Sequence, residues 1–237
     1  MNDSAKTVLK QYWGHAGFRG SQEEIIEAAL NGEDVMALLP TGGGKSLCYQ
    51  IPGIVLPGLC VVVSPLLALM EDQVSDLNSR GIRAMSLSGK LSQEDLIRKL
   101  DNVEYGKFSF LYVSPERLQQ ELVIERIKNL NINLIAIDEA HCISQWGFDF
   151  RPAYLKCSVL RDLLPETPMM ALTATATPEV MKDIEELLRL QDPKIFRDSI
   201  QRTNITYAVL ETENKNYRLT RLLQRHPGSA IVYVQTR

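Results

Sequence analysis

Short apolar runs rich in β-branched residues recur along the chain, and stretches with apolar residues at helical spacing lie between them. The runs occupy residues 35–40, 60–65, 83–88, 110–115, 134–139 and 169–175. Because they are apolar at consecutive positions, both faces of each predicted strand must be covered, as in a parallel sheet between two layers of helices. The alternation predicts an α/β fold with a mostly parallel, doubly wound sheet flanked by helices.

Three stretches between and after these runs carry clear helix signals. Residues 21–30 have apolar side chains at helical spacing, and residues 92–100 repeat the pattern behind a possible SQED cap. A third helix is expected over 178–190, where Thr177 is the predicted N-cap and Pro178 takes the first helical position. These helices supply part of the covering layers that the predicted sheet requires.

Beyond the third helix the pattern changes. Residues 194–211 are predicted as extended chain that leaves the domain, followed by a helix over 217–225 and a strand over 230–235. One helix and one strand are too few to build a sheet of their own. We therefore expect a first domain over 1–205 and the beginning of a second over 206–237, in a native chain that is longer.

Composition adds little to this picture. The 237 residues carry a formal net charge of -3, so overall charge gives no argument for a nucleic-acid partner. The four cysteines form no CxxC pair and the three histidines show no metal-ligand spacing, which is typical of reduced thiols in a cytoplasmic protein. Since no apolar stretch reaches the roughly 18 residues of a membrane span, we expect no membrane partner.

A glycine-rich loop, TGGGKS, follows the first predicted strand and precedes a segment that can form a helix. Its glycines allow backbone amides to point at phosphate oxygens, and the helix N-terminus adds its positive dipole end. The predicted ATP contacts are Thr41, Gly42, Gly43, Gly44, Lys45 and Ser46, the last also as a magnesium ligand. The general phosphate-loop pattern has glycine where this chain has Leu39, and a glycine-rich turn without a ligand is the alternative.

Two acids, Asp138 and Glu139, end the apolar run at 134–139. Open α/β sheets bind ligands at the carboxyl ends of their strands, so both side chains are expected beside the glycine-rich loop. Asp138 would hold the magnesium ion, and Glu139 would polarise the water that attacks the γ-phosphate of ATP. An acidic turn between strand and helix is the alternative interpretation of the sequence DEAH.

Three separated segments, TGGGKSLCYQIP, DEAHCISQWGFDFRP and ALTATAT, resemble motifs of the RecQ family of superfamily two DNA helicases. The resemblance implies a RecA-like P-loop domain followed by the start of a second RecA-like domain. It also implies magnesium-dependent ATP hydrolysis coupled to 3'-5' movement on single-stranded DNA and to duplex unwinding, in repair and recombination. Zinc enters only through a module that follows the two motor domains in RecQ relatives.

Upstream of the glycine-rich loop, GFRGSQEEII resembles the adenine-recognition motif of these helicases. By this resemblance Gln22 bonds the adenine edge, Arg19 lies against the nucleotide and His15 takes the place of a ring that stacks on the base. The family usually has proline where this chain has Gly20, in a turn on which adenine selectivity depends.

The resemblance also assigns residues to DNA binding and to its coupling with hydrolysis. The aromatic loop after DEAH would stack on DNA bases, although packing within the protein is the alternative. The predicted DNA contacts are Ser64, Pro65, Ser114, Arg117, Trp146, Phe148 and Arg151. The predicted catalytic residues are Lys45, Glu139, His141 and Gln145, with Thr173 and Thr175 as coupling residues whose hydroxyls bridge to the DEAH turn.

The sequence therefore predicts one half of an ATP-driven motor whose partner is single-stranded or forked DNA and which is monomeric. In this family the second domain supplies an arginine finger, so we expect residues 1–237 alone to bind ATP weakly and to unwind nothing. Three alternatives stay open: a related RNA helicase, a nucleotide-gated DNA-binding scaffold, and a P-loop ATPase without a nucleic-acid partner.

Overall fold

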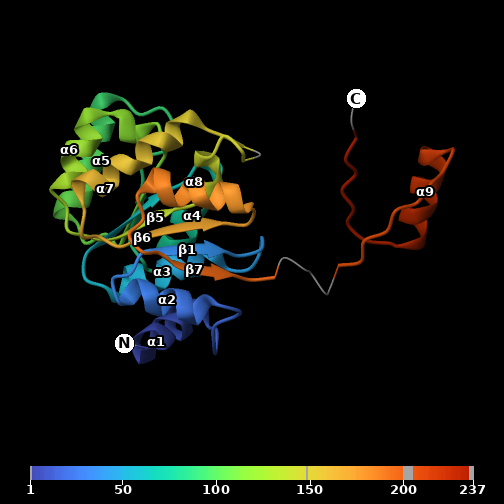
Figure 1. Cartoon of the computed structure of the whole chain (residues 1–237), viewed down its shortest axis with the longest axis horizontal. Helices are drawn as coiled ribbons and strands as arrows, with labels where there is room; N and C mark the ends of the chain where they lie inside the picture. Colours follow the sequence, from blue (N-terminus) through green and yellow to red (C-terminus); the bar gives the residue numbers. More distant parts are fainter. Residues whose placement is uncertain (1, 148, 200–204, 235–237) are drawn as a thin grey trace. The chain divides into compact units, whose positions relative to one another are not determined.

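The computed structural model describes residues 2–147, 149–199 and 205–234. The chain divides into two compact units, Met1–Ile200 and Gln201–Arg237 (Figure 1). The first unit is built around one large sheet, whereas the described part of the second contains a single helix.

The sheet of the first unit has seven strands in the order β3-β4-β2-β5-β6-β1-β7. The strands are β1 (Val35–Leu38), β2 (Leu59–Val63), β3 (Ala84–Ser86), β4 (Phe110–Val113), β5 (Ile132–Ile137), β6 (Met169–Thr173) and β7 (Lys194–Arg197). Every strand pair among the described residues is parallel. The predicted parallel α/β fold is confirmed, and β1 to β6 lie within or next to the predicted runs.

Helices cover both faces of this sheet. They are α1 (Asn2–Trp13), α2 (Gln22–Leu30), α3 (Lys45–Val55), α4 (Leu67–Ser79), α5 (Gln93–Tyr105), α6 (Glu121–Lys128), α7 (Val159–Leu163) and α8 (Pro178–Leu188). Short 3-10 turns span Arg117–Gln119, Ala140–Ile143 and Pro152–Ser158. Within the described residues, no helix combines the length and the apolar character that crossing a bilayer requires.

Alternate residues of the central strand β2 belong to opposite hydrophobic clusters. Val61 and Val63 pack with residues of α5 and α8, while Cys60 and Val62 pack with residues of α2 and α3. In Figure 1, α5 and α8 lie on one side of the sheet, and α2 and α3 lie on the other. This follows from the period of two along a strand and explains why the whole run must be apolar.

Helix caps form where the sequence predicts them. The Ser92 hydroxyl accepts a hydrogen bond from the Asp95 amide at 3.1 Å, and Thr177 accepts one from Val180 at 3.4 Å. Pro178 begins α8. These caps satisfy backbone donors that have no partner inside the helix.

The prediction of extended chain leaving the domain after residue 193 is wrong for its first part. Lys194–Arg197 forms β7, which pairs in parallel with β1. The Lys194 amide donates to the carbonyl of Asp34 at 2.8 Å, and the Asp198 amide donates to that of Leu38 at 3.0 Å. Because β7 is an exposed edge strand, it lacks the continuous apolar run that marks the buried strands.

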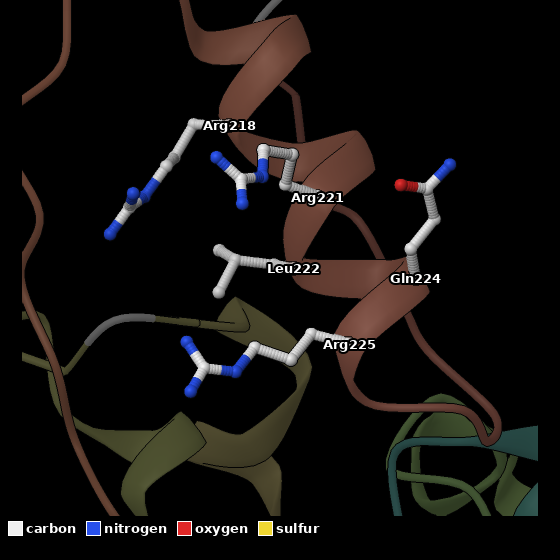
Figure 2. Close-up of a pocket in the computed structure, with 5 residues that line it drawn as sticks. All are labelled: Arg218, Arg221, Leu222, Gln224 and Arg225. Atoms are coloured by element: carbon white, nitrogen blue, oxygen red, sulfur yellow. The ribbon is translucent and has the colours of Figure 1, made fainter.

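In the second unit, α9 (Lys215–Arg225) confirms the predicted helix and begins at the N-cap Asn214. Among the described residues, α9 buries no side chain. Figure 2 shows Arg218, Arg221 and Arg225 on the same side of the helix as Leu222. The predicted strand over 230–235 is not present in its described residues, 230–234, because no neighbouring strand pairs with them.

Candidate functional site

The loop between β1 and α3 curls as its glycines predict. Gly42 and Gly44 have φ angles of 77° and 76°, in the left-handed region that glycine enters without steric cost. A Cβ atom on Gly43 would lie 2.8 Å from the carbonyl oxygen of Pro40. Helix α3 begins immediately afterwards at Lys45, so its N-terminal amides border the loop and favour an anion there.

The departure at Leu39 has a structural reason. The Leu39 side chain is fully buried, and its amide donates to the carbonyl of Thr173 on β6 at 3.1 Å. The residue thus extends the sheet contacts of β1 by one position before the loop begins. A glycine here would leave a gap in the core, whereas leucine fills it.

The acidic turn follows β5 directly and is held from two sides. The Asp138 amide donates to the carbonyl of Val63 at 2.8 Å, and the buried Tyr154 hydroxyl donates to the Asp138 carbonyl at 2.8 Å. Glu139 adopts a φ of 48°, which is uncommon for a residue other than glycine and is concentrated at functional sites. No sequence pattern points to Tyr154, because its partner is a backbone carbonyl.

The charge of Lys45 in the glycine-rich loop acts on both acids of the acidic turn. Burial and the neighbouring Glu139 raise the pKa of Asp138 to about 6, and the charge of Lys45 opposes this shift. A hydrogen bond from His141 and, more weakly, the charge of Lys45 lower the pKa of Glu139. Glu139 therefore stays ionised at neutral pH beside Lys45, as a base for water requires.

Oxygen donors for a magnesium ion come from both segments. Burial raises the pKa of Tyr49, the charges of Tyr112 and Asp138 add to the shift, and the Ser46 side chain opposes it, so Ser46 and Asp138 both act on the same hydroxyl group. No group of three or more His, Cys, Asp or Glu residues within the described ranges could hold a metal alone. The pair of Ser46 and Asp138 fits Mg²⁺, which commonly binds through one carboxylate together with water and substrate phosphates.

His141 joins the acidic turn to β6. Its Nδ1 lies 2.8 Å from the Thr173 hydroxyl and 3.3 Å from Glu139 Oε2. Contacts with the Cys142 thiol and with Glu139 raise the pKa of His141 to about 9, so the ring is charged at neutral pH. The predicted bridge is made by Thr173, while Thr175 contributes its amide to the same hydroxyl at 3.2 Å.

The aromatic loop after His141 is anchored at its base. The buried Ser144 hydroxyl donates to Asp183 on α8 at 2.5 Å and accepts from the Trp146 amide at 3.1 Å. A Cβ atom on Gly147 would lie 2.6 Å from the carbonyl oxygen of His141, so only glycine fits this approach. The loop is therefore tied to the residue that bridges to β6.

The side chains of this loop face different surroundings. Trp146 is 78% exposed, and Gln145 is also exposed. Phe150 is partly buried, which fits a packing role for that ring. Phe148 lies outside the described residues. Of the predicted stacking residues in the described part of the loop, Trp146 presents its ring to solvent.

Two of the predicted DNA contacts bond to each other. Arg151 donates to the carbonyl of Pro65 at 2.9 Å and forms an ion pair with Asp149 at 3.0 Å. Arg151 thereby links the aromatic loop to the segment that follows β2. This link places both candidates at the carboxyl edge of the sheet.

The other candidates are less accessible than the sequence predicts. The Arg117 guanidinium donates to the carbonyls of Leu87 and Gly89. The Ser64 and Ser114 side chains are buried, and the Ser64 hydroxyl has no hydrogen-bond partner within the described part of the chain. Both serines terminate strands at the same edge as Asp138.

The predicted adenine-recognition residues meet the glycine-rich loop. Gln22 Oε1 accepts from the Arg19 amide at 2.9 Å, and its Nε2 donates to the carbonyl of Gly43 at 3.0 Å. A cavity of about 120 Å³ lies between them, and His15, Gly17, Arg19, Gln22, Gly42, Gly43, Gly44 and Leu47 line it. The fold thus brings together the two segments to which the sequence assigned the nucleotide.

Comparison with known proteins agrees with this geometry. The profile of the DEAD/DEAH box helicase family matches residues 19–184, which contain the glycine-rich loop, the acidic turn and β6. A probable ATP-dependent DNA helicase RecS of Bacillus subtilis is 46% identical over 97% of this chain and 47% of its own length. The ATP-dependent DNA helicase RecQ of the same organism is 40% identical over 100% of this chain and 41% of its own length.

A solved structure shares the fold at low sequence identity. It is a DUF1998 helicase, MrfA, bound to DNA, with a TM-score of 0.64 and 20% identity over 83% of this chain and 29% of that one. The chain spans less than half the length of the two curated relatives. The resemblance to RecQ helicases inferred from the motifs is confirmed.

Proposed function

The chain belongs to the DEAD/DEAH box helicase family, and from this premise we propose that it is the ATP-hydrolysing half of a motor that moves on DNA. The observation that carries the proposal is the convergence of Lys45 with Asp138 and Glu139. Phosphoryl transfer depends mainly on positioning and charge neutralisation, and these three groups supply both at one point.

Each residue has a distinct part in hydrolysis. Lys45 neutralises the β- and γ-phosphates. Glu139, kept ionised by His141 and Lys45, orients and polarises the attacking water. Ser46 and Asp138 would hold Mg²⁺, which supplies further neutralisation of phosphate charge when bound. Gln22, Arg19 and His15 are proposed to hold the adenine at the other end of the site.

The link from DNA to hydrolysis runs through the aromatic loop. We propose that single-stranded DNA stacks on Trp146, with Arg151 on the phosphate backbone. Because Gly147 lies against the carbonyl of His141, a shift of the loop reaches a side chain that bonds to Glu139. Displacements of about 1 Å at such groups change reaction rates strongly.

By the RecQ resemblance, a chain with both motor domains would translocate in the 3'-5' direction on single-stranded or forked DNA and act in repair and recombination as a monomer. Its Trp146 is proposed to be the sensor of bound DNA. The RNA-helicase alternative is distinguished by comparing binding of single-stranded DNA and of RNA with the same sequence, measured by fluorescence anisotropy.

The nucleotide site is tested by calorimetric titration of the 237-residue chain with MgATP. Lys45→Ala is expected to weaken binding about 100-fold, because it removes charge-assisted bonds to phosphate. Lys194→Ala is the matched control, since Lys194 is an exposed lysine on the edge strand β7. Equal affinity of the Lys45→Ala variant and the unaltered chain would exclude this site.

Coupling is tested separately through ATP turnover with and without single-stranded DNA. In a chain with both motor domains, Trp146→Ala is expected to leave basal turnover unchanged and to reduce the stimulation by DNA. Unchanged stimulation would favour a P-loop ATPase without this coupling. For residues 1–237 alone we expect weak ATP binding and no unwinding, and robust DNA-stimulated turnover would contradict that expectation.

A further inference from the structure

The carboxylate of Asp198 bonds to the turn that precedes Gln22. Asp198 follows β7 directly, and its amide donates to the carbonyl of Leu38 on β1 at 3.0 Å. Its Oδ1 accepts from the Ser21 hydroxyl at 2.6 Å, and its Oδ2 accepts from the Ser21 amide at 3.4 Å. Two segments that are 177 positions apart in the sequence are thereby joined.

Gly20 makes room for this contact. It has a φ of 50°, and a Cβ atom built on it would overlap Asp198 Oδ2. The turn therefore needs glycine for two reasons, namely its left-handed backbone and the space that the carboxylate takes. Gly20 is also where this chain departs from the usual proline-containing turn, so the contact of its neighbour Ser21 with Asp198 takes the place of a rigid ring.

The turn fixed by Asp198 leads directly into the nucleotide site. Ser21 is the N-cap of α2, and the next residue, Gln22, bonds to the Arg19 amide and to the glycine-rich loop. Burial, together with the charge of Asp198, raises the pKa of Cys48 to about 12, so the carboxylate also lies near the helix that begins at Lys45. Asp198 is thus bonded to the turn that leads into the nucleotide site.

We propose that Asp198 is a positioning residue that sets the adenine-recognition turn through Ser21 and joins it to the chain segment leading to the second unit. The inference rests on the proposed function, because it assigns a role at the ATP site. Asp198 acts through Ser21 and Gln22 and does not itself bind the base. A displacement of the segment after β7 would move the carboxylate and loosen the turn that holds adenine.

The test compares two ligands that differ only at the adenine end. MgATP needs the turn, whereas magnesium tripolyphosphate engages only the phosphate-binding loop. In calorimetric titrations of the 237-residue chain, Asp198→Ala is expected to weaken MgATP binding about fivefold and to leave tripolyphosphate binding unchanged. Asp198→Asn keeps an acceptor for the Ser21 hydroxyl and is expected to retain most of the affinity. Lys194→Ala on the preceding strand β7 is the control.

A double-variant cycle tests the space argument. Gly20→Ala is expected to weaken MgATP binding because the new methyl group displaces the carboxylate. In the Asp198→Ala background the same substitution should weaken binding less, since only the backbone strain remains. Additive effects would show that Gly20 serves its own backbone alone and would overturn the packing argument.

The outcomes separate this inference from the proposed function. Equal weakening of both ligands by Asp198→Ala, or no weakening of either, would overturn the role of Asp198 while leaving the ATP site standing. Failure of the unaltered chain to bind MgATP would overturn the proposed function and this inference together. If Asp198→Ala does not fold, Ser21→Ala removes the 2.6 Å bond from the other side, and the same selective loss of MgATP binding is expected.

Discussion

The two units of this chain differ in what surrounds their secondary structure. In the first, Val61 and Val62 of β2 are fully buried against opposite layers of helices. In the second, Leu222 on α9 is 36% exposed, and the described residues of the helix bury no side chain. Both units nevertheless contain helices that begin at capped N-termini, Thr177 in the first and Asn214 in the second.

The difference teaches which elements depend on neighbours. A helix makes its hydrogen bonds within itself, so a cap and a spacing pattern suffice to define α9. A strand makes its bonds with another strand. Residues 230–234 have an apolar sequence and no strand partner, and they are not a strand. The mostly exposed β7 has only two apolar residues among its four and is a strand, because β1 lies beside it.

The largest effect is expected at the buried ion pair of the first unit. Asp34 accepts from Arg161 at 2.5 Å and from the amides of Met169 and Gln191 at 2.7 and 2.6 Å. Asp34→Ala leaves the buried Arg161 guanidinium without its counterion and two amides without their acceptor, so we expect a loss of about 4 kcal/mol in the free energy of unfolding. Urea unfolding measures it. The control is Arg225→Ala in the second unit, which we expect to lower the free energy of unfolding by less than about 0.5 kcal/mol.

The next effect compares apolar side chains of the two units. Ile135→Ala in β5 removes a fully buried side chain and is expected to lower the free energy of unfolding by about 3 kcal/mol. Leu222→Ala in α9 should lower the free energy of unfolding by less than about 0.5 kcal/mol, because the Leu222 side chain is not buried in a core. Comparable losses in urea titrations would mean that α9 packs in a core, and the contrast between the units would fail.

A smaller effect on the free energy of unfolding depends on pH and concerns the site of the first unit, not its apolar core. Burial raises the pKa of Asp138 to about 6, above the value of 3.8 for the unfolded chain. The folded state therefore favours the protonated form, and stability is lost as the pH rises from the lower value through the higher one. Asp138→Asn should raise the free energy of unfolding by about 2 kcal/mol at about pH 7.5.

This gain should shrink toward zero at about pH 4, where the carboxyl is protonated in both states. The measurement is urea unfolding at both pH values, without nucleotide or magnesium. A gain that is independent of pH would mean that the substitution acts by packing and not through the charge of Asp138. A stabilising substitution that removes a proposed metal ligand is the expected trade-off between stability and function.

The residues of the candidate site could be predicted from the sequence, whereas the contacts that support them could not. Gly42, Gly44 and Lys45 stand side by side in the sequence, so their geometry follows from local backbone rules. Tyr154 and Asp198 gave no signal in the sequence, since their partners are a backbone carbonyl and a distant serine. The reason why leucine replaces glycine at position 39 is its fully buried side chain, which the sequence pattern does not reveal.

The sequence by itself determined the features whose causes lie within a few residues. These are the six buried strands, the capped helices α5, α8 and α9, and the curl of the glycine-rich loop, because apolar runs, capping side chains and glycine dihedrals act locally. Tertiary structure alone decided that β7 joins the sheet, that Arg161 pairs with Asp34, and that Asp198 holds Ser21. Each of these joins groups far apart along the chain, and only the packed sheet brings them within bonding distance.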